Sequence, residues 1–100
     1  MRNEHMDLKT TYPTPRPGVI GQVLDGEAVL VLPERGKVEV LNEVGSFIWA
    51  RLDGKQSIEE IALAICAEYK VELPQARADA LSFLKNLEAR GVLVLANQQA

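Results

Sequence analysis

Hydrophobic residues in the first half of the chain follow the spacing of β-strands. Apolar residues dominate segments 19–24 and 27–32, and Asp25-Gly26 stands between them. Asp-Gly suits a type I′ turn, in which both central residues have positive φ, so this pattern predicts a β-hairpin. Segment 37–41 alternates polar and apolar residues, as a half-buried strand does. We therefore predict three antiparallel strands in meander order, with a second turn at residues 33–36.

The second half changes to the spacing of amphipathic helices. Asn42 is a favourable N-cap for a first helix, and Gly54 is a favourable stop after it. Ser57 and Glu60 form a capping-box pattern before a second helix, and Pro74 suits the start of a third. The expected core positions are Val44, Phe47, Ile48, Leu52, Ile58, Ile61, Ala62, Ile65, Tyr69, Ala76, Ala80, Phe83, Leu84 and Leu87.

The two ends of the chain flank one folded unit. Prolines at positions 13, 15 and 17 favour an extended, polyproline-like backbone, so we expect residues 1–17 to form a flexible tail. Such a tail is either disordered or an arm that docks on a partner or a second copy. The apolar run 92–95 follows Gly91 and is expected as a strand or an extended segment on the core. Residues 18–96 then form one α+β domain, with residues 97–100 as a C-terminal tail.

The predicted domain is winged-helix-like. Its three-stranded antiparallel sheet is followed by three helices, and the last two have the proportions of a helix-turn-helix. A chain of 100 residues is enough for one such domain, and 47% hydrophobic residues are enough for a folded core.

Charge and composition argue against two classes of partner. The formal net charge is −3, and the lysines and arginines are scattered, whereas nucleic-acid binding needs a basic face. No apolar run approaches the roughly 20 residues that span a bilayer. The first residues lack the pattern of a secretory signal, and a single cysteine cannot form an internal disulfide. We expect a cytoplasmic protein that binds neither nucleic acid nor membranes.

The side chains offer no catalytic set. His5, the one histidine, lies in the predicted tail, so no histidine-based triad or metal cluster can be assembled. Cys66 borders the apolar face of the second helix and is expected to be a small buried hydrophobe. The glycines fall singly at turns and helix ends, and none forms a phosphate-binding loop. We expect no catalytic residue, cofactor or metal, and therefore no enzyme.

Two features allow for binding instead. Strand 37–41 is a candidate sheet edge, which offers unpaired backbone groups to an incoming peptide strand. Lys37 and Glu39 fit equally well with charges that protect an edge from aggregation. In the third helix, Leu81 lies outside the main core stripe, between Arg77 and Glu88, and marks either a groove or a wider core face. Trp49 is expected to pack against the sheet.

Several ordered segments resemble the PqqD-like family over roughly residues 18–95. They are residues 41–49 (LNEVGSFIW), 52–54 (LDG), 57–61 (SIEEI), Asp79, Phe83, Leu84, Leu87 and residues 90–93 (RGVL). The family members that act in pyrroloquinoline quinone synthesis tend to have Cys-Asp-Gly and Gly-Trp-Leu where this chain has Leu52-Asp53-Gly54 and Gly91-Val92-Leu93. The chain is therefore more similar to the broader relatives of other peptide-modifying systems, including lasso-peptide clusters.

The resemblance implies a winged helix that binds the leader of a ribosomally synthesised precursor peptide. In that family the leader adds as a strand beside the third strand and contacts the third helix. The chain would then present the precursor to a modifying enzyme, such as a radical S-adenosylmethionine enzyme, a cyclase or a leader protease. Carried over to this sequence, the peptide-binding residues are Lys37, Val38, Glu39, Val40, Leu41, Arg77, Leu81, Leu84 and Lys85.

Two other functions compete with peptide recognition. A winged-helix DNA-binding regulator would use the third helix, where Arg77, Lys85 and Arg90 outnumber Asp79 and Glu88 by one charge. A structural dimerisation module would exchange the tail and strands between copies. The chain is thus expected as a monomer or as a dimer, including a swapped one.

Overall fold

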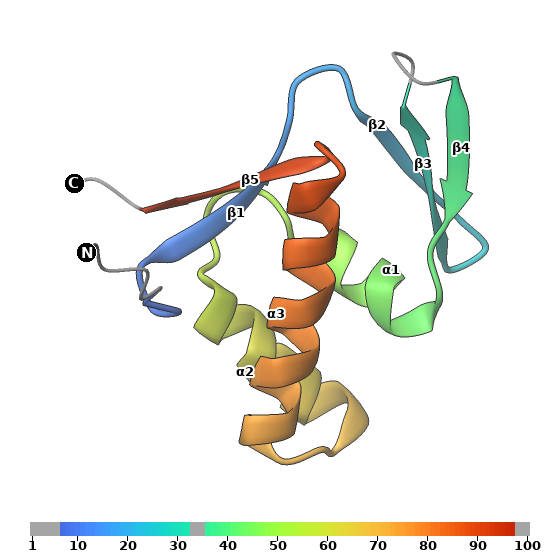
Figure 1. Ribbon diagram of the computed structural model, residues 1–100. Coiled ribbons are helices and arrows are strands. Elements are labelled where there is room, and N and C mark those ends of the chain that lie inside the picture. The colour runs from blue at the N-terminus through green and yellow to red at the C-terminus, as the bar shows by residue number, and fades with distance from the viewer. Residues whose placement is uncertain (1–6, 33–35, 98–100) are drawn as a thin grey trace.

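The computed structural model describes residues 7–32 and 36–97, and Figure 1 shows two small sheets around three helices. Strands β2 (Ile20–Leu24), β3 (Glu27–Leu32) and β4 (Lys37–Val40) form an antiparallel sheet in the order β2-β3-β4. Strands β1 (Thr11–Pro15) and β5 (Leu93–Asn97) form a second, two-stranded sheet. The predicted α+β class, with a three-stranded meander and three helices, is confirmed.

The hairpin forms as its turn residues predict. Asp25 has φ 54° and Gly26 has φ 80°, so both central turn residues have the positive φ of a type I′ turn. On β3, Ala28 and Leu30 are fully buried and face the helices. Of the predicted second turn, residues 33–35 lie outside the described residues, and Gly36 has φ 61°.

The prediction of a flexible tail is wrong for residues 11–15. These residues form β1, which pairs antiparallel with β5 from Thr11↔Asn97 to Pro15↔Leu93. The Arg16 amide donates to the Val92 carbonyl, so by alternation the odd-numbered residues of β1 direct their backbone nitrogen to the outer edge. Pro13 and Pro15 therefore need no N–H for pairing, which makes the alternating prolines suitable for an edge strand. Residues 1–6 and 98–100 lie outside the described residues.

The helices begin at their predicted caps. The Asn42 side chain accepts a hydrogen bond from the Gly45 amide at 2.8 Å, and helix α1 (Glu43–Trp49) follows. Both hydrogen bonds of the Ser57–Glu60 capping box precede helix α2 (Ile58–Tyr69). Helix α3 (Leu73–Ala89) starts one residue before Pro74.

The ends of the helices depart more from the prediction. Helix α1 ends at Trp49, five residues before the expected stop at Gly54. The N-cap of α3 is Glu72, whose side chain makes no capping hydrogen bond. Gly91, with φ 76°, follows α3 as predicted, and the next segment is the strand β5.

One hydrophobic core joins the three-stranded sheet to the helices. A β-carbon on Gly21 would clash with the indole ring of Trp49, so the Trp49 ring packs on β2, as expected. An ion pair connects α3 to α2. Arg77 of α3 donates two hydrogen bonds to the carboxylate of Glu59 on α2, at 2.9 and 2.7 Å. This guanidinium lowers the pKa of Glu59. The buried core comprises Ala28, Leu30, Leu32, Leu41, Ile48, Leu52, Ile58, Ile61, Ala62, Ile65, Ala76, Ala80, Leu84, Leu87, Val92 and Leu93.

Candidate functional site: the outer edge of strand β4

The outer edge of β4 is open in the described part of the chain, because β4 pairs there only with β3. The Leu41 amide donates to the Ala28 carbonyl at 2.9 Å, which marks Ala28 and Leu41 as a hydrogen-bonding position of this antiparallel pair. Such positions alternate along the strands, so Glu39 and Lys37 also direct their backbone groups toward β3. The N–H and C=O groups of Val38 and Val40 therefore point to the outer edge. These four groups can pair with an added strand.

Ser46 fixes the end of this strand to helix α1. Its hydroxyl accepts a hydrogen bond from the Ala28 amide at 2.8 Å and donates one to the Leu41 carbonyl at 3.2 Å. The hydroxyl thus bridges the donor and acceptor that would otherwise pair directly across β3 and β4. Ser46 is only 5% exposed, so its bonds satisfy backbone groups that water does not reach. The sequence analysis missed this role, although Ser46 lies within the segment 41–49.

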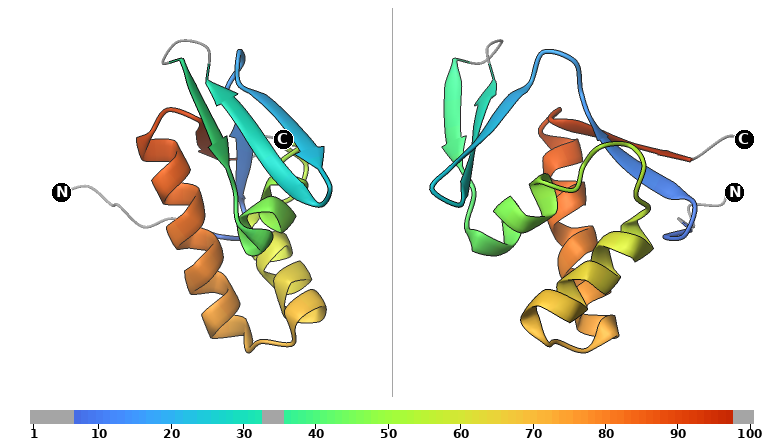
Figure 2. Two further views of the ribbon diagram at one scale, coloured as in Figure 1. Left: turned by 90° about the vertical axis from the view of Figure 1, so that its right-hand side faces the viewer. Right: turned by 180° about the vertical axis from the view of Figure 1, so that it is seen from behind.

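Strand β4 is the strand of its sheet nearest to α3, and β2 is the farthest (Figure 2, left). An ion pair connects the two elements, because the Arg90 guanidinium after α3 donates to the carboxylate of Glu39 on β4. Arg90 also donates to the Asn86 side chain at 3.0 Å, one helical turn earlier. Phe83 lies one helical turn before Asn86 and two turns before Arg90, on the same flank. We call Phe83, Asn86 and Arg90 the β4-facing flank of α3.

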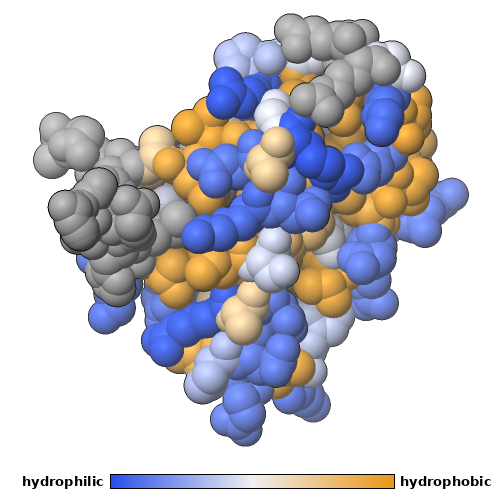
Figure 3. Space-filling view, viewed as in Figure 1, coloured by the Kyte–Doolittle hydropathy of each residue, from blue (hydrophilic) through white to orange (hydrophobic). Residues whose placement is uncertain are grey.

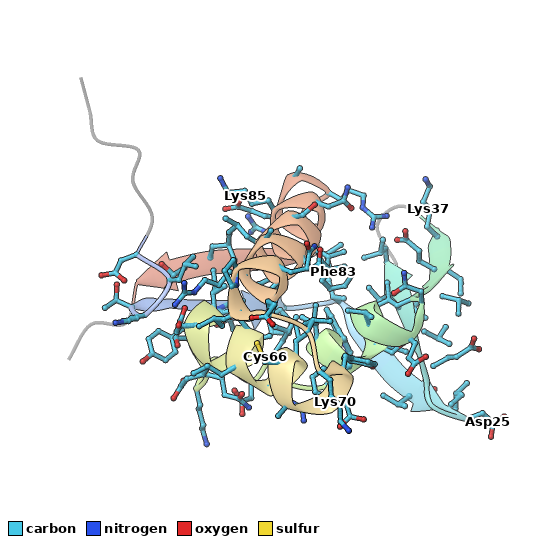
Figure 4. All side chains as sticks on the ribbon, turned by 90° about the horizontal axis from the view of Figure 1, so that it is seen from below. Asp25, Lys37, Cys66, Lys70, Phe83 and Lys85 are labelled. Carbon is cyan, nitrogen blue, oxygen red and sulfur yellow. The ribbon has the colours of Figure 1, made fainter. Side chains whose placement is uncertain are left out.

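Helix α1 makes room for the aromatic residue of this flank. A β-carbon on Gly45 would lie 2.8 Å from the Phe83 ring, so the ring rests directly on the backbone of α1. Phe83 is only half-buried. Figure 4 shows Phe83 on the side of α3 toward Lys37 and β4. An apolar ring therefore lies on the side of α3 that faces the open edge.

The five strand residues predicted to bind peptide lie together. Lys37, Val38, Glu39 and Val40 form β4, and Leu41 follows it as a buried residue. Val38 is 67% exposed and Val40 57% exposed, and both lie on the sheet face opposite Glu39.

The four predicted residues of the third helix do not lie beside β4. Leu84 is fully buried in the core, and Arg77 is bound to Glu59 of α2. Leu81 follows Arg77 by four residues and shares its flank. Lys85 lies on the side of α3 opposite Phe83 (Figure 4). The structure therefore does not bring these four residues to β4, and the flank of α3 toward β4 carries Phe83, Asn86 and Arg90 instead.

The remaining candidate chemistry is sparse. Within residues 7–32 and 36–97, no three His, Cys, Asp or Glu side chains come together as metal ligands. Cys66 is a free, partly exposed cysteine packed beside the core. No helix in the described part of the chain is long and apolar enough to cross a membrane.

Known proteins share both the sequence pattern and the fold. A family described as "Coenzyme PQQ synthesis protein D (PqqD)" matches residues 27–93. The solved structure of TbiB1 in complex with the TbiA(beta) leader peptide is 36% identical in sequence, with a TM-score of 0.75. The match covers 80% of this chain and 93% of TbiB1. A search of curated proteins found no match.

Two further solved structures have the same architecture. A lasso peptide synthetase B1, complexed with the leader peptide, is 26% identical, with a TM-score of 0.74, and covers 82% of this chain and 96% of its own. The PqqD truncation of Methylobacterium extorquens PqqCD, a ribosomal-peptide recognition element, is 24% identical, with a TM-score of 0.68. That match covers 82% of this chain and 87% of the truncation, and at this identity it supports the fold.

Proposed function

The chain belongs to the PqqD family, and on that premise we propose that it binds the leader of a ribosomally synthesised precursor peptide by strand addition to β4. The observation that carries this proposal is the pair of backbone sites at Val38 and Val40, which point outward on the edge nearest α3. Two structural relatives contain a leader peptide, which supports a peptide as the ligand of this fold.

Hydrogen bonds between the backbones of the leader and β4 do not depend on the leader's side chains, so they tolerate many leader sequences. Contacts with the leader's side chains determine which sequences bind best. A strand added to β4 lies between the sheet edge and the β4-facing flank of α3. Its side chains on the helix side meet the Phe83 ring and the Glu39–Arg90 ion pair. We therefore expect an apolar leader residue near Phe83 and a polar one near Arg90.

The proposed role is non-catalytic. The domain holds the leader, and a separate modifying enzyme acts on the core of the precursor. Binding both components near each other raises the effective concentration of the core at the enzyme. This mechanism requires only binding surfaces, such as the outer edge of β4 and the β4-facing flank of α3.

DNA regulation, the main alternative, loses support from the ion pairs of α3. Of the three basic residues that would anchor phosphates, Arg77 is bound to Glu59 and Arg90 to Glu39. A guanidinium that already pairs with a carboxylate contributes less to phosphate neutralisation. Lys85 then remains as the third basic residue of that set.

Titration of the ¹⁵N-labelled protein with leader peptide tests the proposal. We expect the largest amide shifts in residues 37–41 and in residues 83–90, because the added strand changes both surroundings. The amides of Arg77 and Leu81 should shift less, since they lie on the other flank of α3. Binding with shifts confined to β1, β5 or α2 would reject the proposed site.

A further inference from the structure

The outer face of the three-stranded sheet, which points away from the helices, is unusually apolar. By alternation from the buried Ala28 and Leu30, the residues that face outward on the three strands include Ile20, Leu24, Val29, Val31, Val38 and Val40. We call these six residues the outer sheet face. The described strands place two polar side chains at outward positions, the uncharged Gln22 on β2 and the charged Glu27 at the hairpin end.

The pattern on β3 is that of a strand covered on both sides. An antiparallel sheet with one face in water normally alternates buried apolar with exposed polar residues. Strand β3 instead follows Glu27 with Ala-Val-Leu-Val-Leu, so Val29 and Val31 face outward. On the neighbouring strand β2, Ile20 and Leu24 are each 54% exposed. Exposed apolar patches of this kind mark interaction sites on soluble proteins.

No element of the described chain covers this face. In the left view of Figure 2, the sheet lies in front of the helices with no other ribbon before it. In the space-filling view, apolar surface also gathers on the side where the sheet lies (Figure 3).

The size of the face argues against a second copy as its occupant. Three strands of about five residues, spaced about 4.8 Å apart, present roughly 250 Å². A stable protein–protein interface needs about 800 Å² from each partner. The outer sheet face alone is therefore too small for a lasting symmetric dimer, whereas a transient contact with an enzyme requires less area.

The face is continuous with the proposed peptide site. Val38 and Val40 belong to both, since their backbone groups point to the open edge and their side chains point outward. A leader strand added to β4 would extend the same face by one strand and add its own outward side chains. The apolar surface would then be larger in the peptide-loaded protein than in the empty one.

We propose that the outer sheet face docks the enzyme that modifies or cleaves the bound precursor, through an uncharged apolar patch on that enzyme. This inference rests on the proposed leader binding and adds the enzyme contact to it. The enzyme contacts the sheet and the outward side of the leader together, so it prefers the loaded domain. The empty domain offers a smaller surface and competes weakly for the enzyme.

The test compares two substitutions on the same strand. Ile20→Thr with Leu24→Thr makes the outer sheet face polar and keeps two β-strand residues at positions remote from β4. Val23→Thr is the matched control, because Val23 is 53% exposed but lies on the other side of β2. The probes are the synthetic leader, for affinity, and the purified enzyme that processes the same precursor, for the rate of core modification.

We expect the double variant to bind leader with a Kd within about twofold of wild type, because the sites are distant. Its processing rate at limiting enzyme should fall about tenfold or more, as when hot-spot side chains are lost from an interface. The control should match wild type in both measurements. Thermal unfolding by circular dichroism verifies that both variants are folded.

Three results would overturn the enzyme contact. They are an unchanged processing rate in the double variant, a parallel loss of leader affinity in that variant, and a wild-type dimer that the double substitution converts to monomer. Wild-type protein that fails to bind leader would instead overturn the proposed function itself. Measuring leader affinity first separates the two failures.

Discussion

Replacing Val38 with proline is expected to abolish leader binding while the domain stays folded. The Val38 amide points to the open edge, so its loss removes no hydrogen bond within the sheet. It does remove one bond to the added strand, and the proline ring occupies the position where that strand approaches. Together these effects predict a loss of about 100-fold in affinity. Fluorescence anisotropy with a labelled leader peptide measures it.

Val23→Pro is the matched control at the opposite edge of the same sheet. Ala28 directs its backbone toward β4, so its β2 partner Val23 directs its amide outward, away from β3. Both substitutions thus place proline at an outward amide of an edge strand. Leader affinity should fall with Val38→Pro and persist with Val23→Pro. The reverse pattern would place the peptide on β2.

Ser46→Ala is expected to lower the free energy of unfolding more than a Ser→Ala substitution at the exposed Ser82. It leaves the buried Ala28 amide and the Leu41 carbonyl without the hydroxyl that bridges them. An unsatisfied buried group costs about 1 to 3 kcal/mol. This exceeds the gain of about 0.5 kcal/mol from alanine's helix propensity. Urea denaturation should therefore show a lower free energy of unfolding.

The end of β4 should also become less well fixed, so leader affinity is expected to fall with Ser46→Ala. Ser82→Ala serves as the control, because Ser82 is exposed on α3. Its free energy of unfolding should stay within about 0.5 kcal/mol of wild type. Equal stability of the Ser46 and Ser82 variants would contradict the role assigned to the hydroxyl.

The sequence predicted those features that depend on local chemistry. Asp25-Gly26 specifies its turn through φ, and Asn42 and Ser57 specify helix starts through side-chain hydrogen bonds. Pro13 and Pro15 do not identify their strand from the sequence alone, because an extended proline segment and an edge strand have the same backbone requirements. Only the partner strand β5, some 80 residues later, distinguishes them.

The side of α3 that faces β4 could not be predicted from the sequence for a similar reason. Leu81 and Phe83 border the core stripe of α3 on opposite sides, and each is flanked by charged residues. Which side faces β4 depends on how α3 packs against the sheet, a tertiary choice that no local pattern encodes. The contact between Arg90 and Glu39, 51 residues apart, identifies the side.

Hydrogen exchange at alternate residues of β4 tests the strand addition most directly. With saturating leader, the amides of Val38 and Val40 should gain protection of about tenfold or more, because they acquire partners. The amides of Lys37 and Glu39 already donate to β3 and should change little. If leader binds while Val38 and Val40 exchange as fast as before, the peptide does not pair with this edge.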